Sequence, residues 1–172
     1  AYKKVQSMQV SRAVTLARDT DYIAVGTAMG PVKLYDSKGT FKENIRHGGD
    51  GGLVFYTDKE EKKLAHVSTQ GRVSIHSLLD AENNQSFSID MPVYSIAYHD
   101  NKLFFGTDSD TIQVWDVSGK YIQSYTGKHL DPVSALQATD NAIIKTSYGR
   151  CIAIDKETGK EKCHWDRLMP IH

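Results

Sequence analysis

The chain has 172 residues, of which 40% are hydrophobic and 24% are charged, and its 21 basic residues balance its 21 acidic residues. This composition is that of an ordinary globular protein of one domain or part of a larger one. A zero net charge excludes an overall attraction to nucleic acid or to an anionic membrane. Two cysteines, Cys151 and Cys163, are too few for a disulfide framework, so we expect a reducing compartment, cytoplasmic or nuclear.

The start of the chain is not expected to be a secretory signal. The first ten residues lack the apolar segment of a secretory signal, and no apolar run approaches the roughly 18 residues that a membrane span needs. The first residue is Ala1 rather than Met. We therefore expect a processed chain or a piece of a longer one, without a membrane partner.

A single pattern recurs along the chain: an apolar run, a small hydroxyl residue, a short polar or glycine turn, and an alternating apolar run. It occupies residues 22–36, 63–77, 102–116 and 143–155. The aligned hydroxyl residues, spaced 41, 39 and 39 residues apart, are Thr27, Ser68, Thr107 and Thr146. A near-constant period held through four copies predicts a repeat protein.

Each repeat holds about four short strands. The apolar residues alternate with period two, and clusters of Asp, Asn, Ser and Gly separate the runs. Four strands in about 40 residues is the size of a β-propeller blade, and a blade must stack on another because it cannot cover both of its faces. We predict an all-β fold, a β-propeller of about four four-stranded antiparallel blades at residues 12–47, 51–89, 92–126 and 131–165.

The two ends of the chain favour an open ring over a closed four-bladed ring, which stays the alternative. Residues 161–165, "EKCHW", already supply an outer strand to the fourth blade, so residues 1–11 are interpreted as a lone outer strand of a preceding blade. We therefore expect the four blades to form part of a larger or incomplete ring. Its uncovered face would need the remainder of a propeller, a second copy or another protein.

Two motifs carry a family resemblance. Residues 106–116, "GTDSDTIQVWD", resemble the second half of a WD repeat, and residues 127–136, "GKHLDPVSAL", resemble the first half. The chain is thus similar to the WD-repeat (WD40-like) β-propeller family, as a degenerate member. In the other blades the Trp-Asp position reads Tyr35-Asp36, His76-Ser77 and Ile154-Asp155.

The resemblance also implies a hydrogen-bonded brace of His, Asp, Ser or Thr, and Trp within a blade. The residues matching the structural positions of the family are Thr107, Trp115, Asp116 and His129. The Asp position of the same blade is Ser109, with an aspartate on either side, and His129 belongs to the following blade. We expect no blade to hold the complete brace, so the stability of the blades must depend more on apolar packing.

The resemblance implies a function as well. WD-repeat propellers bind peptides or partner domains through the loops at one rim, which implies a non-catalytic protein–protein interaction scaffold within a multiprotein assembly. The candidate partner-binding positions, called the rim residues below, are Met29, His47, Gln70, Arg72, Met91, Asp108, His129, Tyr148 and Arg150. Exposed Met, Tyr and Arg side chains are types that contribute strongly to binding energy.

Other chemistry finds little support in the sequence, and we expect no catalytic residue, metal or cofactor. The glycine-rich residues 47–52 precede a strand rather than the helix of a phosphate loop. A calcium loop starting at Asp108 would need an oxygen ligand at Ile112. Among Cys151, Cys163, His164 and His172 there is no paired spacing typical of zinc. Two alternatives stay open: a hydrolase-like propeller enzyme with a central-channel site, and an RNA-associated propeller.

Overall fold

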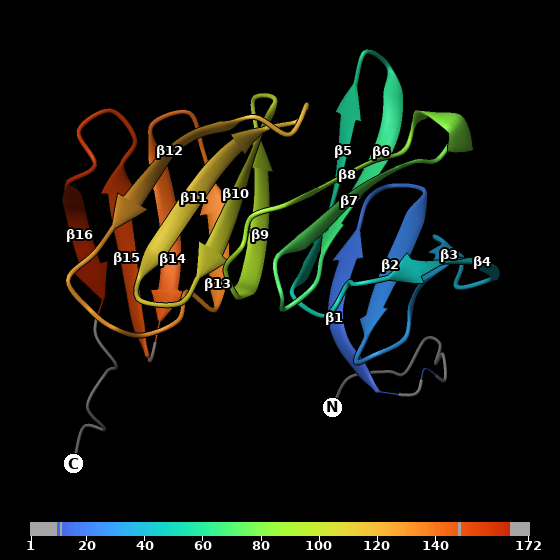
Figure 1. The fold of residues 1–172 in the computed structure, drawn as a ribbon, viewed down its shortest axis with the longest axis horizontal. Helices are drawn as coiled ribbons and strands as arrows, with labels where there is room; N and C mark the ends of the chain where they lie inside the picture. The colour runs from blue at the N-terminus through green and yellow to red at the C-terminus, as the bar shows by residue number, and fades with distance from the viewer. Residues whose placement is uncertain (1–9, 11, 148, 166–172) are drawn as a thin grey trace. The chain divides into compact units, whose positions relative to one another are not determined.

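The computed structural model describes residues 10, 12–147 and 149–165 (Figure 1). These residues form sixteen strands in four four-stranded antiparallel sheets. The predicted all-β fold, built of four antiparallel four-stranded blades of the propeller type, is confirmed. The lone strand expected in residues 1–11 lies, apart from Val10, outside the described residues.

The strands follow one another across each sheet in chain order. The first blade comprises β1 (Ala13–Arg18), β2 (Tyr22–Thr27), β3 (Pro31–Asp36) and β4 (Phe41–His47). The second comprises β5 (Gly52–Asp58), β6 (Glu61–Val67), β7 (Arg72–Ser77) and β8 (Gln85–Ser88). The third comprises β9 (Val93–His99), β10 (Lys102–Thr107), β11 (Thr111–Asp116) and β12 (Tyr121–Thr126). The fourth comprises β13 (Ala135–Ala138), β14 (Ala142–Ser147), β15 (Arg150–Asp155) and β16 (Glu161–Trp165).

The chain divides into two compact units, residues 1–88 and residues 89–172, with two blades in each. Within the described ranges the helical content is one short 3-10 turn, η1 (Ala81–Asn83), in the connection between β7 and β8. No helix in this part of the chain has the length and apolar character required to cross a bilayer.

Each unit is held together by apolar side chains between its two blades. In the first unit, Val32, Leu34 and Ile45 pack with Leu53 and Leu64. These positions face one another because side chains alternate along a strand, so every second residue of a blade points to its neighbour.

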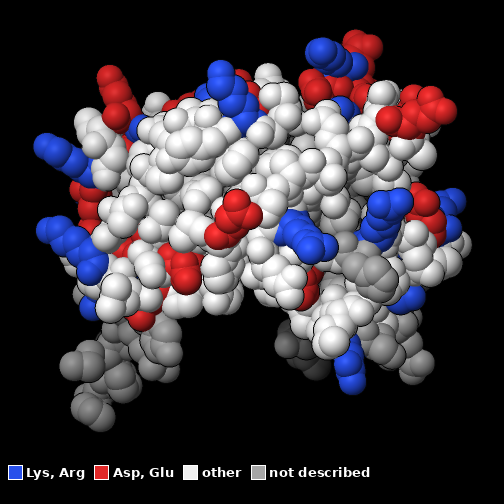
Figure 2. All heavy atoms as spheres, viewed as in Figure 1, with Lys and Arg blue, Asp and Glu red and all other residues white. Residues whose placement is uncertain are grey.

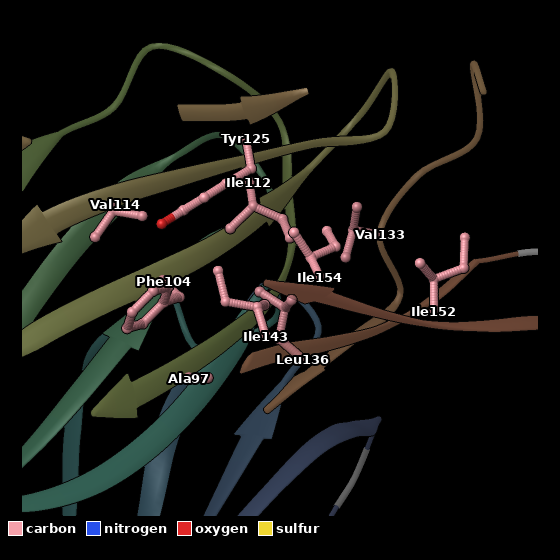
Figure 3. Close-up of a cluster of buried hydrophobic side chains, with 10 residues drawn as sticks. All are labelled: Ala97, Phe104, Ile112, Val114, Tyr125, Val133, Leu136, Ile143, Ile152 and Ile154. Atoms are coloured by element: carbon pink, nitrogen blue, oxygen red, sulfur yellow. The ribbon is translucent and has the colours of Figure 1, made fainter. Parts of the chain in front are cut away.

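The second unit repeats this packing with larger side chains. Phe104, Ile112 and Val114 of the third blade cluster with Ile143 and Ile154 of the fourth (Figure 3). Figure 3 shows Ile112 and Ile154 pointing toward one another. Burying such side chains contributes about 1.5 to 3 kcal/mol each, which makes the face between two blades the main source of stability in each unit.

The last residue of the third strand of each blade binds the turn that follows. The carboxylates of Asp36, Asp116 and Asp155 each accept two hydrogen bonds from backbone N–H groups of that turn, at 2.8 to 3.0 Å. In the second blade the Ser77 hydroxyl takes this role and accepts from the backbone N–H groups of Asp80 and Leu79, at 3.0 and 3.3 Å respectively. A short acceptor side chain at this position satisfies backbone donors that a strand end would leave unpaired.

The innermost strands of paired blades approach one another very closely at a glycine. In the first unit the Thr15 hydroxyl on β1 donates to the carbonyl of Gly49, beside Gly26. In the second unit the Ser95 hydroxyl on β9 donates to the carbonyl of Val133 at 2.7 Å, beside Gly106. The same contact therefore recurs in both units, and only a residue without a side chain leaves room for it.

We predict that Gly106→Ala destabilises the protein by about 2 to 4 kcal/mol, because an added Cβ would lie 2.7 Å from the Val133 carbonyl oxygen and closer still to the Ser95 hydroxyl. Urea unfolding followed by tryptophan fluorescence measures the change. Lys120→Ala, at an exposed position of the same sheet, serves as the control and should stay within about 0.5 kcal/mol of the parent. An unchanged midpoint for Gly106→Ala would contradict the close approach.

Candidate interaction site

The rim residues of the first unit lie in its turns. Met29, in the turn between β2 and β3, is 87% exposed and has a positive φ of 60°. Gln70, in the turn between β6 and β7, and Arg72, the first residue of β7, are exposed, and their backbone N–H groups donate to the Ser68 hydroxyl at 3.3 and 3.2 Å. His47 ends β4, and its side chain lies outside the described part of the structure.

The rim residues of the second unit are spread over four places along the chain. Asp108 begins the turn between β10 and β11, and its carbonyl accepts from Thr111 N–H at 3.3 Å. Met91 precedes β9, and its sulfur accepts from the Gln113 side chain at 2.8 Å. Tyr148 lies outside the described residues.

The structure brings one pair of the rim residues together. His129, in the connection between β12 and β13, and Arg150, at the start of β15, lie with their side-chain nitrogens 2.7 and 2.9 Å apart. These two residues are 21 positions apart in the sequence. Their contact places the loop after β12 against the turn between β14 and β15.

The residues matched to the WD-type structural positions make separate hydrogen bonds. The Thr107 hydroxyl donates to the Thr111 carbonyl at 2.8 Å, and the Trp115 indole donates to the Gln113 side chain at 2.9 Å. Asp116 binds its own turn, and the pKa of its carboxyl is held below its ordinary value, first by the hydrogen bond from the Ser118 hydroxyl. Each of these residues therefore supports local structure.

The hydroxyl position of the fourth blade is one residue later than the sequence alignment places it. Counted from the residue of the second strand that pairs with the last residue of the third strand, the position of Thr27, Ser68 and Thr107 is held in the fourth blade by Ser147 rather than Thr146. The reason is the turn between β14 and β15, in which Ser147 pairs directly with Arg150. That turn is one residue shorter than its counterparts.

A buried ion pair joins the two blades of the second unit. Asp110, in the turn between β10 and β11, contacts the Lys145 ammonium on β14, and the two side chains are only 2% and 3% exposed. The carboxylate of Asp110 also accepts from the backbone N–H of His129 at 3.2 Å. Of the two aspartates that flank Ser109, the one that the structure buries is therefore Asp110, and it anchors the loop that follows β12.

The loop after β12 forms one wall of a cavity of about 350 Å³. Lys128, Lys145 and Lys160 line this cavity, which we call the lysine cavity, and Ile152 and Ile154 form its apolar part. Gly127 is required at its edge, because a Cβ there would collide with the Asp110 carboxylate.

The first unit has a cavity of about 400 Å³ at the equivalent place, with a different lining. His66 occupies the position of Lys145: each lies opposite a leucine of the innermost strand, Leu53 or Leu136. Gly30 occupies the position of Asp110, three residues after the equivalent threonine. The ion pair of the second unit is thus replaced by a glycine and a histidine in the first.

His66 is a buried neutral base. It is 1% exposed, its Nδ1 lies 3.4 Å from the Gly48 carbonyl, and burial lowers its pKa from 6.5 to about 4. The nearby His76, which lines the same cavity, lowers the pKa further by charge repulsion. In the first unit, therefore, the side chain at this buried position is uncharged at neutral pH.

Charges of both signs are mixed on the face shown in Figure 2. Within the described residues there is no group of three or more His, Cys, Asp and Glu side chains placed to hold a metal ion. Cys163 and His164 are consecutive on β16, opposite Ala153 and Ile152 of β15, and therefore lie on opposite faces of that sheet.

Three residues of this region were missed in the sequence. Asp110 and Lys145 are 35 positions apart, and no local pattern links them. Leu130, 86% exposed beside His129, is an apolar residue between polar neighbours in a loop. An apolar residue in a polar loop is a pattern that could have revealed Leu130 from the sequence.

Comparison with known proteins supports the fold and nothing finer. No protein family and no curated protein matches the chain. Among solved structures, it is similar to the computationally designed Ika8 protein, with 21% identity and a TM-score of 0.62 over 87% of this chain and 47% of Ika8. It is also similar to the computationally designed Ika4 protein, with 19% identity and a TM-score of 0.62 over 98% of this chain and 100% of Ika4. The chain thus spans about half the length of Ika8, and identities this low show the fold alone.

We predict that Lys145→Met destabilises the protein by about 3 kcal/mol, because it leaves the Asp110 carboxylate buried without its cation. The double variant Asp110→Gly with Lys145→His, which copies the first unit, should lose less than half as much. Chemical unfolding of both variants measures the difference. A double variant less stable than Lys145→Met would refute the equivalence of the two positions.

The stability of the protein should also fall below pH 6.5 because of His66. Its folded-state pKa is about 4 against 6.5 for the unfolded chain, so the unfolded state binds more protons between these values. Stability is complete above pH 6.5 and declines as the pH falls toward 4. Between pH 7.5 and 5.0 we expect a loss of about 2 kcal/mol from this group.

Comparison of the parent with His66→Gln isolates that contribution, since His66→Gln should lose about 2 kcal/mol less over the same pH interval. Lys120→Ala, which removes an exposed lysine and no histidine, is the control and should keep the parent's pH dependence over the same interval. Equal pH dependence in His66→Gln and the parent would show that His66 is not buried as a neutral base.

Proposed function

We propose that this protein is a non-catalytic protein–protein interaction scaffold of the WD-repeat type, which presents the loops between its strands as a docking surface within a multiprotein assembly in the cytoplasm or nucleus. The support is physical: rigid antiparallel sheets hold exposed apolar side chains at loop ends. Loops on a rigid framework are common binding sites, since they vary without disturbing the core.

Met29 is the observation that carries the proposal. A non-glycine residue at φ of 60° costs about 1 kcal/mol, and glycine or asparagine would relieve that cost. Its apolar side chain gains nothing in return from packing, because it is 87% exposed. A strained and exposed methionine is better explained by contact with another molecule than by stability.

Leu130 supports the same proposal in the second unit. It is 86% exposed, and the loop that carries it is fixed by the hydrogen bond from His129 N–H to the buried Asp110. A rigid loop presents an apolar side chain at a low entropic cost of binding.

Exposed apolar side chains on the first and fourth blades fit a protein partner as well. Thr15 and Ala17 of β1 face the second blade, so Val14 and Leu16 point the opposite way, and Leu16 is 70% exposed. On β16, Trp165 lies on the face of its sheet away from the third blade and is 55% exposed. We propose that these faces are covered by protein, either the remainder of a propeller or a second copy.

The test separates binding from folding at the two loop positions. Met29→Gly should raise the free energy of unfolding by about 1 kcal/mol, because it relieves the positive φ. The same variant, and Leu130→Ser, should each retain far less protein partner than the parent in affinity capture quantified by mass spectrometry. Leu79→Ser, at a residue 79% exposed in the connection between β7 and β8, is the control and should retain the parent's partners.

The mass of the purified chain in solution completes the test, since a dimer or a stoichiometric complex is expected. If all three variants capture the same proteins in the same amounts as the parent, the loop surface is not where partners bind. Metal-independent turnover of an ester or peptide substrate by the pure chain would instead favour an enzyme.

A further inference from the structure

We infer that the lysine cavity of the second unit is a binding site for an acidic side chain of a partner peptide. This inference rests on the proposed function in one respect only, that the partner is a protein. It is carried by the charge of the cavity, by its shape, and by its difference from the equivalent cavity of the first unit.

The lining of the cavity has an excess of positive charge. Lys145 and Asp110 neutralise one another, and Lys128 and Lys160 together outweigh the single charge of Glu161. Lys128 and Lys160 have no acidic partner among the residues that the structure describes. These two ammonium groups, both exposed at the cavity, attract a carboxylate or phosphate.

The shape of the cavity suits one side chain better than an extended polyanion. Its volume of about 350 Å³ is at the small end of the range for ligand pockets. Ile152 and Ile154 supply an apolar wall on which the methylene groups of a glutamate can pack. Tyr125, the aromatic residue of the lining, uses its hydroxyl to donate to the Lys156 carbonyl at 2.7 Å. Its ring is 9% exposed, so it offers little surface on which a nucleic-acid base could stack.

The exposed Leu130 lies two residues after Lys128, in the same loop. A peptide that places an acidic residue in the cavity can therefore place an apolar residue on Leu130. This combination favours an amphipathic acidic peptide over RNA, which would need a longer row of phosphate contacts.

The first unit shows that the fold does not require these lysines. Its equivalent cavity is lined by amide, hydroxyl and histidine side chains such as Asn44, Ser86 and His66, with Arg46 as the cation of the lining and no lysine. The strand order and the glycine contact that the two units share therefore do not fix which cations line the cavity. We attribute the three lysines of the second cavity to a ligand of opposite charge.

The experiment uses the full chain and a fluorescein-labelled decapeptide of alternating glutamate and leucine, titrated by fluorescence anisotropy. The matched probe replaces each glutamate with glutamine, and a third probe is a labelled ten-nucleotide oligouridylate. We expect the glutamate peptide to bind at least tenfold more tightly than the other two. Its binding should shift the backbone amide signals of Gly127 and Gly159, which border the cavity, in an NMR spectrum.

The double variant Lys128→Ala with Lys160→Ala, at two exposed positions, should weaken binding of the glutamate peptide at least tenfold without changing the unfolding midpoint. Lys38→Ala with Lys120→Ala removes two other exposed lysines and should leave binding unchanged. The inference is overturned if the glutamine peptide binds equally well, if both double variants weaken binding alike, or if only the RNA binds. None of these results would alter the Met29 and Leu130 test, so the two proposals can fail separately.

Discussion

The structure depends on one constraint, which is that a four-stranded blade cannot cover its own faces and must bring another blade into contact. The hydrogen bonds of a sheet run within its plane, so they satisfy the backbone but leave both apolar faces open to water. The innermost strands achieve the contact through a hydroxyl-to-carbonyl hydrogen bond at a glycine, at Gly26 in one unit and Gly106 in the other. The apolar clusters around Leu34 and Phe104 are arranged by that approach, and so are the cavities beside them.

The features that the sequence predicts are those that repeat locally. Strand alternation, turn residues and a period near 40 residues are all properties of neighbouring positions, and they were enough for the four antiparallel blades. An average period of about 40 residues does not reveal a shift of one residue within a single repeat. The fourth blade therefore had its hydroxyl residue assigned to Thr146, although the shorter turn before Arg150 places Ser147 there. The two-blade units escaped prediction because the sequence gives the period but not which faces pack together.

The site was harder to predict because its geometry comes from contacts between blades. Exposure of Met29 follows from its place in a turn, which the resemblance to a WD-repeat rim supplied. The ion pair of Asp110 with Lys145 joins residues in different sheets, so no spacing rule reveals it. A lysine in an alternating strand, between Ile144 and Thr146, reads as an exposed position until the neighbouring blade is in place. Burial of His66 was hidden in the same way.

The two units place different residues at one pair of equivalent buried positions. This difference explains how the second unit supports the loop after β12. In the first unit, Gly30 and the neutral His66 occupy the two positions, and the loop between β4 and β5 is held by close backbone packing at Gly49 and Gly51. In the second unit, two charges are desolvated at a cost that a neutral pair avoids. The ion pair fixes the conformation of the loop, because the Asp110 carboxylate binds the backbone N–H of His129 as well as the Lys145 ammonium. The loop after β12 needs a glycine where Gly127 meets Asp110, and beyond that contact its positions carry lysine, histidine and an exposed leucine.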